Sequence, residues 1–291
     1  MSIVNAREML LKGTREKYAV GAFNITNLIQ MEAVVEAAVK KNAPLIIQTS
    51  VTAAKFLGPK VLVSIYRTLA ESSPIPICLH LDHCTDVAFC KSCADAGYTN
   101  IMIDASKESL EENIRKTREV SDYCHRVGDL SVEGELGTVS GVEDQVKVAE
   151  NEELLCDPDS AVEFVKRSGV DLFAPAIGTA HGVYKTVDPK IDFDRLERIA
   201  DRLKRKGLEV PLVVHGGTGL PPRTVKTLIS LGGSKFNVST ELKITLIDTI
   251  YDYISSKRDE YDPGKIDKAV KQAIMERIES WIDLLGCAGK A

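Results

Sequence analysis

Eight short apolar segments, separated by helical patterns, place the strongest constraint on how this chain folds. Each is nearly continuously apolar, which is typical of strands buried on both faces of a parallel sheet. The predicted strands are residues 18–24, 44–50, 75–82, 99–104, 130–136, 170–177, 210–216 and 234–239. Helical spacing of apolar residues, often ending at glycine, predicts helices over residues 27–42, 59–72, 109–128, 157–169, 193–207 and 221–233.

This alternation predicts the α/β class and, within it, a closed (β/α)8 TIM barrel. Eight such units in 291 residues fit a barrel better than an open sheet, whose glycine-rich dinucleotide fingerprint is missing after residues 18–24. Residues 241–291 predict extra C-terminal helices, separated at "DPG", beyond what barrel closure requires. No linker interrupts the pattern, so we expect residues 1–291 to form a single domain.

Composition narrows the range of partners and compartments. The 37 basic residues are outnumbered by 42 acidic ones, which leaves no basic surplus for binding nucleic acid. No apolar run approaches the roughly 20 residues that span a bilayer, so no membrane partner is expected. The N-terminus is predicted to be a short amphipathic helix rather than a signal peptide, and seven scattered cysteines suggest reduced thiols. Both features indicate a cytoplasmic protein.

Chemically active side chains collect where the predicted strands end, and in a barrel these ends form one rim. His83, His181 and His215 follow three different strands, and neutral imidazoles arranged in this way can bind Zn²⁺ with a position left open for substrate. Each histidine alone could equally end its strand and bind backbone or water. His80 and His125 are interpreted as structural or surface residues, with a role in orienting a ligand left open for His80. The other polar residues at the strand ends are Asn24, Ser50, Asp82, Asp104, Glu133, Glu135 and Asn237.

Glycine-rich turns suggest a phosphate site on the same rim. The stretches "IGTAHG" and "HGGTG" follow the sixth and seventh strands, and "NVST" opens the helix after the eighth. Backbone N–H groups and hydroxyls at such a helix start can bind an anion, and barrels often bind phosphate at this position. A metal, a phosphate site and acidic residues together suggest aldol cleavage, which needs two proton transfers. Asp82 and the acidic segment 137–146, either a mobile lid or a simple exposed turn, could perform them.

Ordered motifs along nearly the whole chain carry a resemblance to a known family. They include "YAVGAFNITNLIQMEAVVEAA", "LHLDH", "VEGELGTVSGVED", "AIGTAHGVYK", "VVHGGTG" and "NVSTELK". The chain resembles the class II, zinc-dependent ketose-bisphosphate aldolases of the fructose-bisphosphate and tagatose-bisphosphate group. This resemblance implies an enzyme that reversibly cleaves a phosphorylated ketose into dihydroxyacetone phosphate and an aldehyde.

The resemblance also implies a role for each matching residue. His83, His181 and His215 match the zinc ligands, while Asp82 and Glu143 match the two proton-transferring residues. Asp104 and Glu135 match positions that hold a second metal or an alternative position of the zinc. Asn24 and Ser50 match substrate contacts of the first two strands. The dihydroxyacetone phosphate pocket, usually completed by Na⁺ or K⁺, matches Gly182, Gly216, Gly217, Thr218, Asn237, Val238, Ser239 and Thr240.

Departures from the family pattern bear on the substrate. Gly264 stands where the family usually has an arginine that reaches a neighbouring subunit's site and binds the distal phosphate of the sugar. The adjacent Lys265 is a weaker replacement for that bidentate group. The turn expected after the second strand, "SVTAAK", lacks the glycine that the family often has there, and Ala105 stands where glycine is common. We therefore hypothesise a ketose 1-phosphate substrate rather than a bisphosphate.

Other interpretations of the sequence remain open beside the zinc aldolase. Lys235 on the eighth strand could form a Schiff base without any metal. The chain could also be a non-catalytic barrel that assists the assembly of a partner aldolase. A metallohydrolase is disfavoured because its usual His-x-His is absent from the first strand. The helical tail suggests a homodimer or homotetramer.

Overall fold

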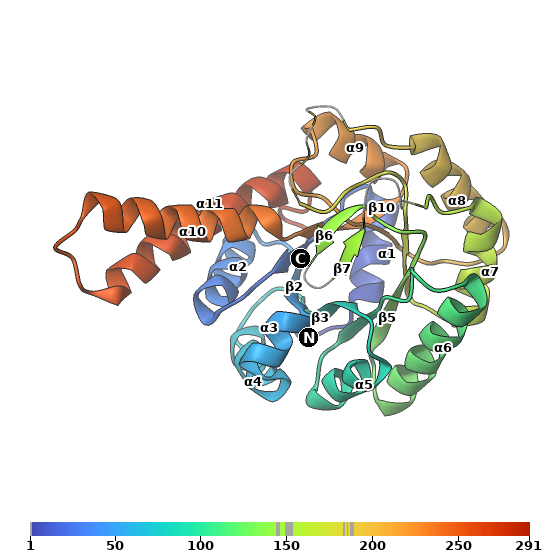
Figure 1. Cartoon of the computed structure of the whole chain (residues 1–291), viewed down its shortest axis with the longest axis horizontal. Coiled ribbons are helices and arrows are strands. Elements are labelled where there is room, and N and C mark those ends of the chain that lie inside the picture. The colour runs from blue at the N-terminus through green and yellow to red at the C-terminus, as the bar shows by residue number, and fades with distance from the viewer. Residues whose placement is uncertain (1, 144–145, 149–153, 183, 185, 187–188) are drawn as a thin grey trace.

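The predicted barrel is present in the computed structural model, which describes residues 2–143, 146–148, 154–182, 184, 186 and 189–291. Of residues 142–143 and 146–148 only the backbone is described. Parallel strands pair in the closed order β1-β10-β9-β8-β5-β4-β3-β2 (Figure 1). They are β1 (Val20–Asn24), β2 (Leu45–Ser50), β3 (Ile77–Cys84), β4 (Asn100–Ile103), β5 (Ser131–Leu136), β8 (Leu172–Pro175), β9 (Leu212–Val214) and β10 (Gly233–Val238).

Helices surround the barrel and begin and end at residues that favour those positions. Asn27, Ser109 and Asp157 accept hydrogen bonds from backbone N–H groups in the first turns of their helices. Gly97 and Gly169 end two helices with positive φ. The surrounding helices are α2 (Leu28–Lys40), α3 (Val51–Leu57), α4 (Pro59–Glu71), α5 (Val87–Ala96), α6 (Leu110–Val127), α7 (Pro158–Ser168), α8 (Phe193–Arg205) and α9 (Pro222–Ser230).

Two short segments differ from the sequence expectation. The residues after β2, expected to be a turn, form helix α3, because Ser50 accepts a hydrogen bond from the N–H of Ala53 at 3.3 Å and caps a new helix. The acidic segment after β5 contains an antiparallel hairpin of β6 (Gly141–Glu143) and β7 (Val146–Val148). Hairpins of this size carry little periodic signal in sequence.

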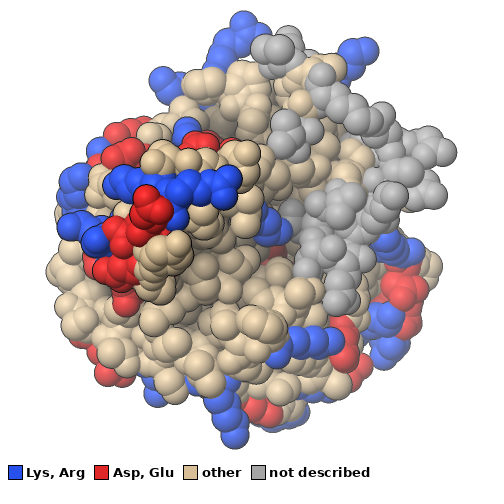
Figure 2. Space-filling model, turned by 60° about the vertical axis from the view of Figure 1, so that its left-hand side comes forward, with Lys and Arg blue, Asp and Glu red and all other residues tan. Residues whose placement is uncertain are grey.

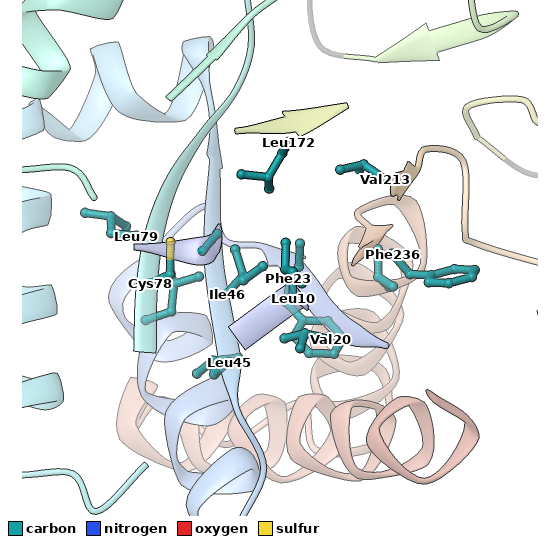
Figure 3. Close-up of a cluster of buried hydrophobic side chains, with 14 of the residues drawn as sticks. Leu10, Val20, Phe23, Leu45, Ile46, Cys78, Leu79, Leu172, Val213 and Phe236 are labelled. Carbon is teal, nitrogen blue, oxygen red and sulfur yellow. The ribbon is translucent and has the colours of Figure 1, made fainter. Parts of the chain in front are cut away.

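The end of the barrel opposite the rim is covered by helix α1 (Ala6–Glu16). Ile3 bridges to Ile77 at the start of β3, and the N–H of Ala6 donates to Oγ of Ser131 at the start of β5. Side chains from α1 and the strands then fill the lower core, as Figure 3 shows for Leu10, Val20, Phe23, Leu45, Ile46, Cys78, Leu79, Leu172, Val213 and Phe236. The core is therefore closed below, and only the carboxyl ends of the strands remain open to a ligand.

The tail forms a pair of helices, α10 (Thr240–Ser256) and α11 (Pro263–Leu285), that projects from the barrel (Figure 1). Trp281 of α11 donates from Nε1 to Oε2 of Glu241 at 2.7 Å and ties the pair together near the barrel. Within the described part of the chain, no helix is long and apolar enough to cross a membrane. On the face shown in Figure 2, basic and acidic residues are interspersed. The seven cysteines are free and buried.

Candidate active site

Three histidines from different strands meet at the open rim of the barrel. His83 lies near the end of β3, His215 directly follows β9, and His181 lies in the segment after β8. The ring centroid of His83 lies 4.9 Å from that of His181 and 4.6 Å from that of His215. One ligand atom from each ring lies within 4.8 Å of the other two. The structure thus brings together the three residues that the sequence suggested as metal ligands.

The free nitrogens of these rings have the chemistry of a metal site. Nε2 of His83 and Nε2 of His181 are buried and have no hydrogen-bond partner among the described residues, and the buried Nδ1 of His215 faces Oε2 of Glu135 at 2.8 Å. Nδ1 of His83 lies 2.9 Å from Oδ2 of Asp104, and Nε2 of His215 lies 2.9 Å from Oε1 of Glu133. A carboxylate on one nitrogen fixes the tautomer and leaves the other lone pair for a cation. Burial and the charges of His83 and His215 lower the pKa of His181 well below its usual value, so this ring is held neutral.

An irregularity in β3 aims two consecutive side chains at this centre. On a regular strand Asp82 and His83 would point to opposite faces. His83 instead has a φ of 46°, in the left-handed region, and the pairing of β3 with β4 shifts between Leu81 and Cys84. As a result Nε2 of His83 lies 4.0 Å from Oδ1 of Asp82. Such backbone strain costs ~1–3 kcal/mol and persists where the surrounding structure enforces it.

Asp104 and Glu135 form a second group with His83. One ligand atom from each of the three lies within 4.8 Å of the others. Oε2 of Glu135 also lies 2.8 Å from Nδ1 of His215, so this carboxylate borders both groups. Burial and the charge of Asp104 raise the pKa of Glu135. A cation bound here would offset the free-energy cost of ionising Glu135 at this buried position.

Asp82 is held by amide groups on both of its oxygens. Asn24 donates to Oδ2 at 3.1 Å and Asn237 donates to Oδ1 at 3.2 Å. Gln48 in turn donates to Oδ1 of Asn24 at 2.8 Å, which fixes the orientation of that amide. Burial opposes ionisation, but the charge of His83, with His80 and Lys235 behind it, holds the pKa of Asp82 well below its usual range. The carboxylate is therefore oriented and ionised.

A small pocket lies beside His181. Gly216 and Gly217 let backbones meet there, because a Cβ atom would lie 2.3 Å from the carbonyl oxygen of Ala180 or 2.7 Å from that of Asn237. Oγ of Ser239 is buried at the start of α10 and makes no hydrogen bond to any described residue. Helix starts of this kind favour anions. The lining residues are His181, Gly182, Gly216, Gly217, Thr218, Asn237, Ser239 and Thr240.

Two expected site residues make other contacts, and the side chain of a third is not described. Val238 belongs to β10 and its side chain is buried in the core, so only its backbone borders the rim. The hydroxyl of Ser50 accepts the capping bond of α3. Glu143 ends β6 opposite Val146, and its side chain lies outside the described residues. The stem of that hairpin reaches the site, since the N–H of His181 donates to the carbonyl oxygen of Ser140 at 2.7 Å.

The sequence does not predict the polar layer beneath the rim, which consists of Glu133, Lys235 and Gln48. Glu133 was noted at a strand end without a role, and Lys235 was considered only as a nucleophile. Both side chains are fully buried, as is Gln48. A charged or amide residue within an otherwise apolar strand indicates such a layer, because a buried polar side chain requires a buried partner.

The fold and this rim define an enzyme of the barrel class with a candidate metal centre. The family model "Fructose-bisphosphate aldolase class-II" matches residues 4–290. A fructose-bisphosphate aldolase from Geobacillus stearothermophilus is 42% identical over 294 residues, covering 100% of this chain and 99% of the relative. The chain therefore belongs to the class II fructose-bisphosphate aldolase family and is an aldolase, a lyase.

Solved structures agree with this assignment. The YdjI aldolase from Escherichia coli K12 matches with a TM-score of 0.85 and 31% identity, over 99% of each chain. A fructose-bisphosphate aldolase from Campylobacter jejuni has a TM-score of 0.84 and 22% identity, over 100% of this chain and 97% of the other, which supports the fold alone. The barrel predicted from the sequence is confirmed.

We expect Gly141→Ala to disturb His181. Gly141 has a φ of 107°, and a Cβ atom there would lie 2.3 Å from the carbonyl oxygen of His181. The free energy of unfolding should fall by ~1–3 kcal/mol, and Zn²⁺ affinity, followed by chelator competition, should fall as well. Gly207→Ala is the matched control, because Gly207 has a φ of 68° with nothing within 4 Å of its Cβ position. Equal metal affinity in the two variants would contradict the contact.

Proposed function

We propose that this chain is a zinc-dependent aldolase that reversibly cleaves a phosphorylated ketose into dihydroxyacetone phosphate and an aldehyde. The observation that carries the proposal is the set of three buried imidazole nitrogens that converge beside Asp82, two of them without a partner among the described residues. Family membership and the printed name of the Geobacillus relative support the reaction type.

The histidines would hold the metal, and the second group offers it a neighbouring position. His83, His181 and His215 present imidazole nitrogens, donors of the type that Zn²⁺ prefers. Bound there, Zn²⁺ supplies a Lewis acid that polarises a ketone carbonyl and stabilises developing negative charge. Asp104 and Glu133 orient His83 and His215 through their other ring nitrogens. The rim thereby sets both the ligands and their tautomers.

Asp82 and Glu143 would carry the two proton transfers. The carboxylate of Asp82 is ionised, held by two amides and adjacent to His83, so it can accept the proton of the hydroxyl that becomes the aldehyde carbonyl. Its conjugate acid returns that proton in the condensation direction. We assign to Glu143 the proton exchange on the dihydroxyacetone phosphate carbon, because it lies on the hairpin whose stem contacts His181.

The glycine-lined pocket would take the phosphate of dihydroxyacetone phosphate. Gly217 and Thr218 lie on one side, and the start of α10 with Ser239 lies on the other. The unpartnered Ser239 hydroxyl is a suitable donor to a phosphate oxygen. We propose that Na⁺ or K⁺ completes this pocket and offsets the phosphate charge.

Removal of the metal should abolish cleavage. Several kcal/mol of transition-state stabilisation would leave with it, so dialysis against EDTA should lower kcat by about 10²-fold or more, and added Zn²⁺ should restore it. His181→Ala should remain inactive after Zn²⁺ addition, whereas His125→Ala, at an exposed position on α6, should behave like the unmodified enzyme. Full activity in EDTA would favour the Schiff-base alternative.

The distal end of the substrate is the less defined part of the proposal. Gly264 lies in the first turn of α11, where the N–H donates to Oδ1 of Asp262 at 3.0 Å. The neighbouring Lys265 lies 2.5 Å from Oε2 of Glu260, so its charge is already paired. Neither residue offers a strong second phosphate ligand. This supports our hypothesis that the substrate is a ketose 1-phosphate.

Rates of cleavage should reveal this preference. We expect a higher kcat/KM for fructose 1-phosphate than for fructose 1,6-bisphosphate. Gly264→Arg should shift the ratio toward the bisphosphate by about tenfold, since a charged hydrogen bond contributes about 1.5–3 kcal/mol at best. Gly264→Ala, which changes the backbone preference without adding a donor, is the control. A clear preference of the unmodified enzyme for the bisphosphate would refute the hypothesis.

We propose that the chain assembles as a homodimer or homotetramer through the projecting helices. One face of α10 carries Ile247, Tyr251 and Ile254 with 61%, 70% and 46% of their surface exposed. Their spacing places them on one side of the helix. The stripe is the surface on which we propose that a second copy packs.

Association should depend on this stripe. Tyr251→Glu places a charge in its centre and should shift the molecule toward monomer in sedimentation velocity at micromolar concentration, because a buried unpaired charge opposes association. Asp252→Ala alters an exposed polar neighbour on the same turn and should leave the oligomer unchanged. Unaltered association of Tyr251→Glu would place the interface elsewhere.

A further inference from the structure

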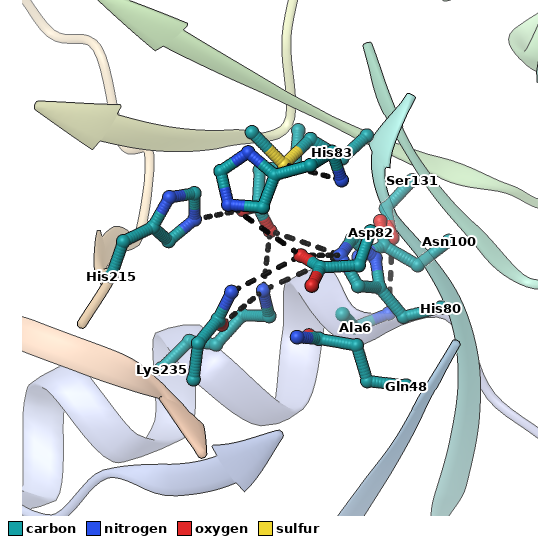
Figure 4. A network of polar contacts seen from close by, with 12 residues as sticks. Ala6, Gln48, His80, Asp82, His83, Asn100, Ser131, His215 and Lys235 are labelled. Carbon is teal, nitrogen blue, oxygen red and sulfur yellow. Dashed lines mark hydrogen bonds and ion pairs between the residues drawn. The ribbon is translucent and has the colours of Figure 1, made fainter. Parts of the chain in front are cut away.

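A buried lysine lies beneath the candidate metal centre and has no role in the mechanism above. Lys235 is in β10 and its side chain is fully buried (Figure 4). Its ammonium lies 2.9 Å from Oε2 of Glu133 and donates to Oδ1 of Asn237 at 2.8 Å. It also lies 3.5 Å from Nε2 of His80. An ammonium has three hydrogens, and Glu133 and Asn237 accept two of them.

The first of these contacts leads to a proposed metal ligand. Glu133 uses Oε2 for Lys235 and Oε1 for Nε2 of His215, at 2.9 Å each. The lysine on Oε2 fixes the orientation of the carboxylate, so that Oε1 is directed at His215. Lys235 therefore holds the carboxylate in line with Nε2 of His215. Nδ1 is the nitrogen that faces the centre, 2.8 Å from Oε2 of Glu135.

The second contact leads to the proposed acid/base. Oδ1 of Asn237 accepts from Lys235, so the NH₂ of the same amide must point the other way. That NH₂ donates to Oδ1 of Asp82 at 3.2 Å. Without the lysine, the amide of Asn237 would be free to rotate and present its oxygen to Asp82, which would repel it. One cation thus sets the orientation of two functional side chains.

A chain of hydrogen bonds below Lys235 fixes its neighbour His80. The N–H of Ala6 donates to Oγ of Ser131 at 3.0 Å, and Ser131 donates to Oδ1 of Asn100 at 2.7 Å. The NH₂ of Asn100 is then directed to Nδ1 of His80 at 2.6 Å, which places the His80 proton on Nε2. This nitrogen faces Oδ1 of Asp82 at 3.8 Å (Figure 4). The chain of contacts fixes His80, and His80 limits the positions open to the ammonium.

We propose that Lys235 is a positioning residue that aligns the metal ligand His215 and the acid/base Asp82 at once, and not a nucleophile. This inference rests on the proposed zinc aldolase function and adds to it. A Schiff base needs an accessible, uncharged amine. The amine here is buried, ion-paired to Glu133 and hydrogen-bonded to Asn237. Its position suits the alignment of neighbours rather than attack on a substrate.

Lys235→Met tests the proposal, because methionine keeps the length and removes the charge. We expect kcat to fall about 10²-fold with KM changed much less, and Zn²⁺ affinity in chelator competition to fall about 10- to 100-fold, as for other groups that orient ligands. Lys60→Met, at an exposed position on α4, should change neither quantity. Unchanged Zn²⁺ affinity and kcat in Lys235→Met would overturn the proposal.

A double variant separates positioning from simple charge balance. Lys235→Met with Glu133→Gln removes both charges, so its melting temperature should recover even if Lys235→Met alone folds poorly. We expect its kcat to stay low, because Asn237 still lacks its donor; a recovered kcat would show charge balance alone and overturn the proposal. So would covalent trapping of substrate on Lys235 by borohydride. Failure of the unmodified enzyme to bind Zn²⁺ or cleave a ketose phosphate would instead refute the proposed function.

Discussion

The buried ion pair between Glu133 and Lys235 is the interaction on which the rest of the site depends. A closed barrel excludes water from its interior, so a polar side chain there must be satisfied by another protein group. Glu133 and Lys235 neutralise each other with an N–O distance of 2.9 Å, and both are fully buried. Through their remaining contacts they connect His215, Asn237 and Asp82. The polar layer is therefore one connected unit rather than a set of separate residues.

The rim above this layer is defined as much by groups that lack partners as by groups that have them. The nitrogens of His83 and His181 that face the centre lack a hydrogen bond within the described structure, and that of His215 faces only Oε2 of Glu135. The second nitrogens of His83 and His215 are held by carboxylates. Buried orphan groups cost about 1–3 kcal/mol each, so folding alone does not explain them. A ligand that accepts lone pairs explains all three together. The strained φ of His83 is consistent with the same requirement.

The sequence predicted the barrel and the rim well because both depend on local patterns. Every predicted strand contains most of an observed one, and residues at strand ends are brought together by topology alone. The pattern did not predict helix α3, which depends on the Ser50 cap, nor the turn of His83 toward Asp82, which depends on a shift in register between β3 and β4. The role of Lys235 was also out of reach, because its partners Glu133 and His80 come from strands distant in sequence. Long-range pairs between buried residues leave no periodic signal in a single chain.

The arrangement separates the reaction from the choice of substrate. The groups that we assign to the metal, to Asp82 and to the first phosphate all lie on the barrel and the start of α10. The residues that differ from the family pattern, Gly264 and its neighbour Lys265, lie at the far end of the projecting helices (Figure 1). In the homo-oligomer that we propose, this segment would act on the rim of another copy. On this proposal, the half of the substrate shared by the family is bound within one chain, while the variable half depends on assembly. Substitutions at the end of the helical pair can then change specificity without disturbing the buried layer that aligns the catalytic groups.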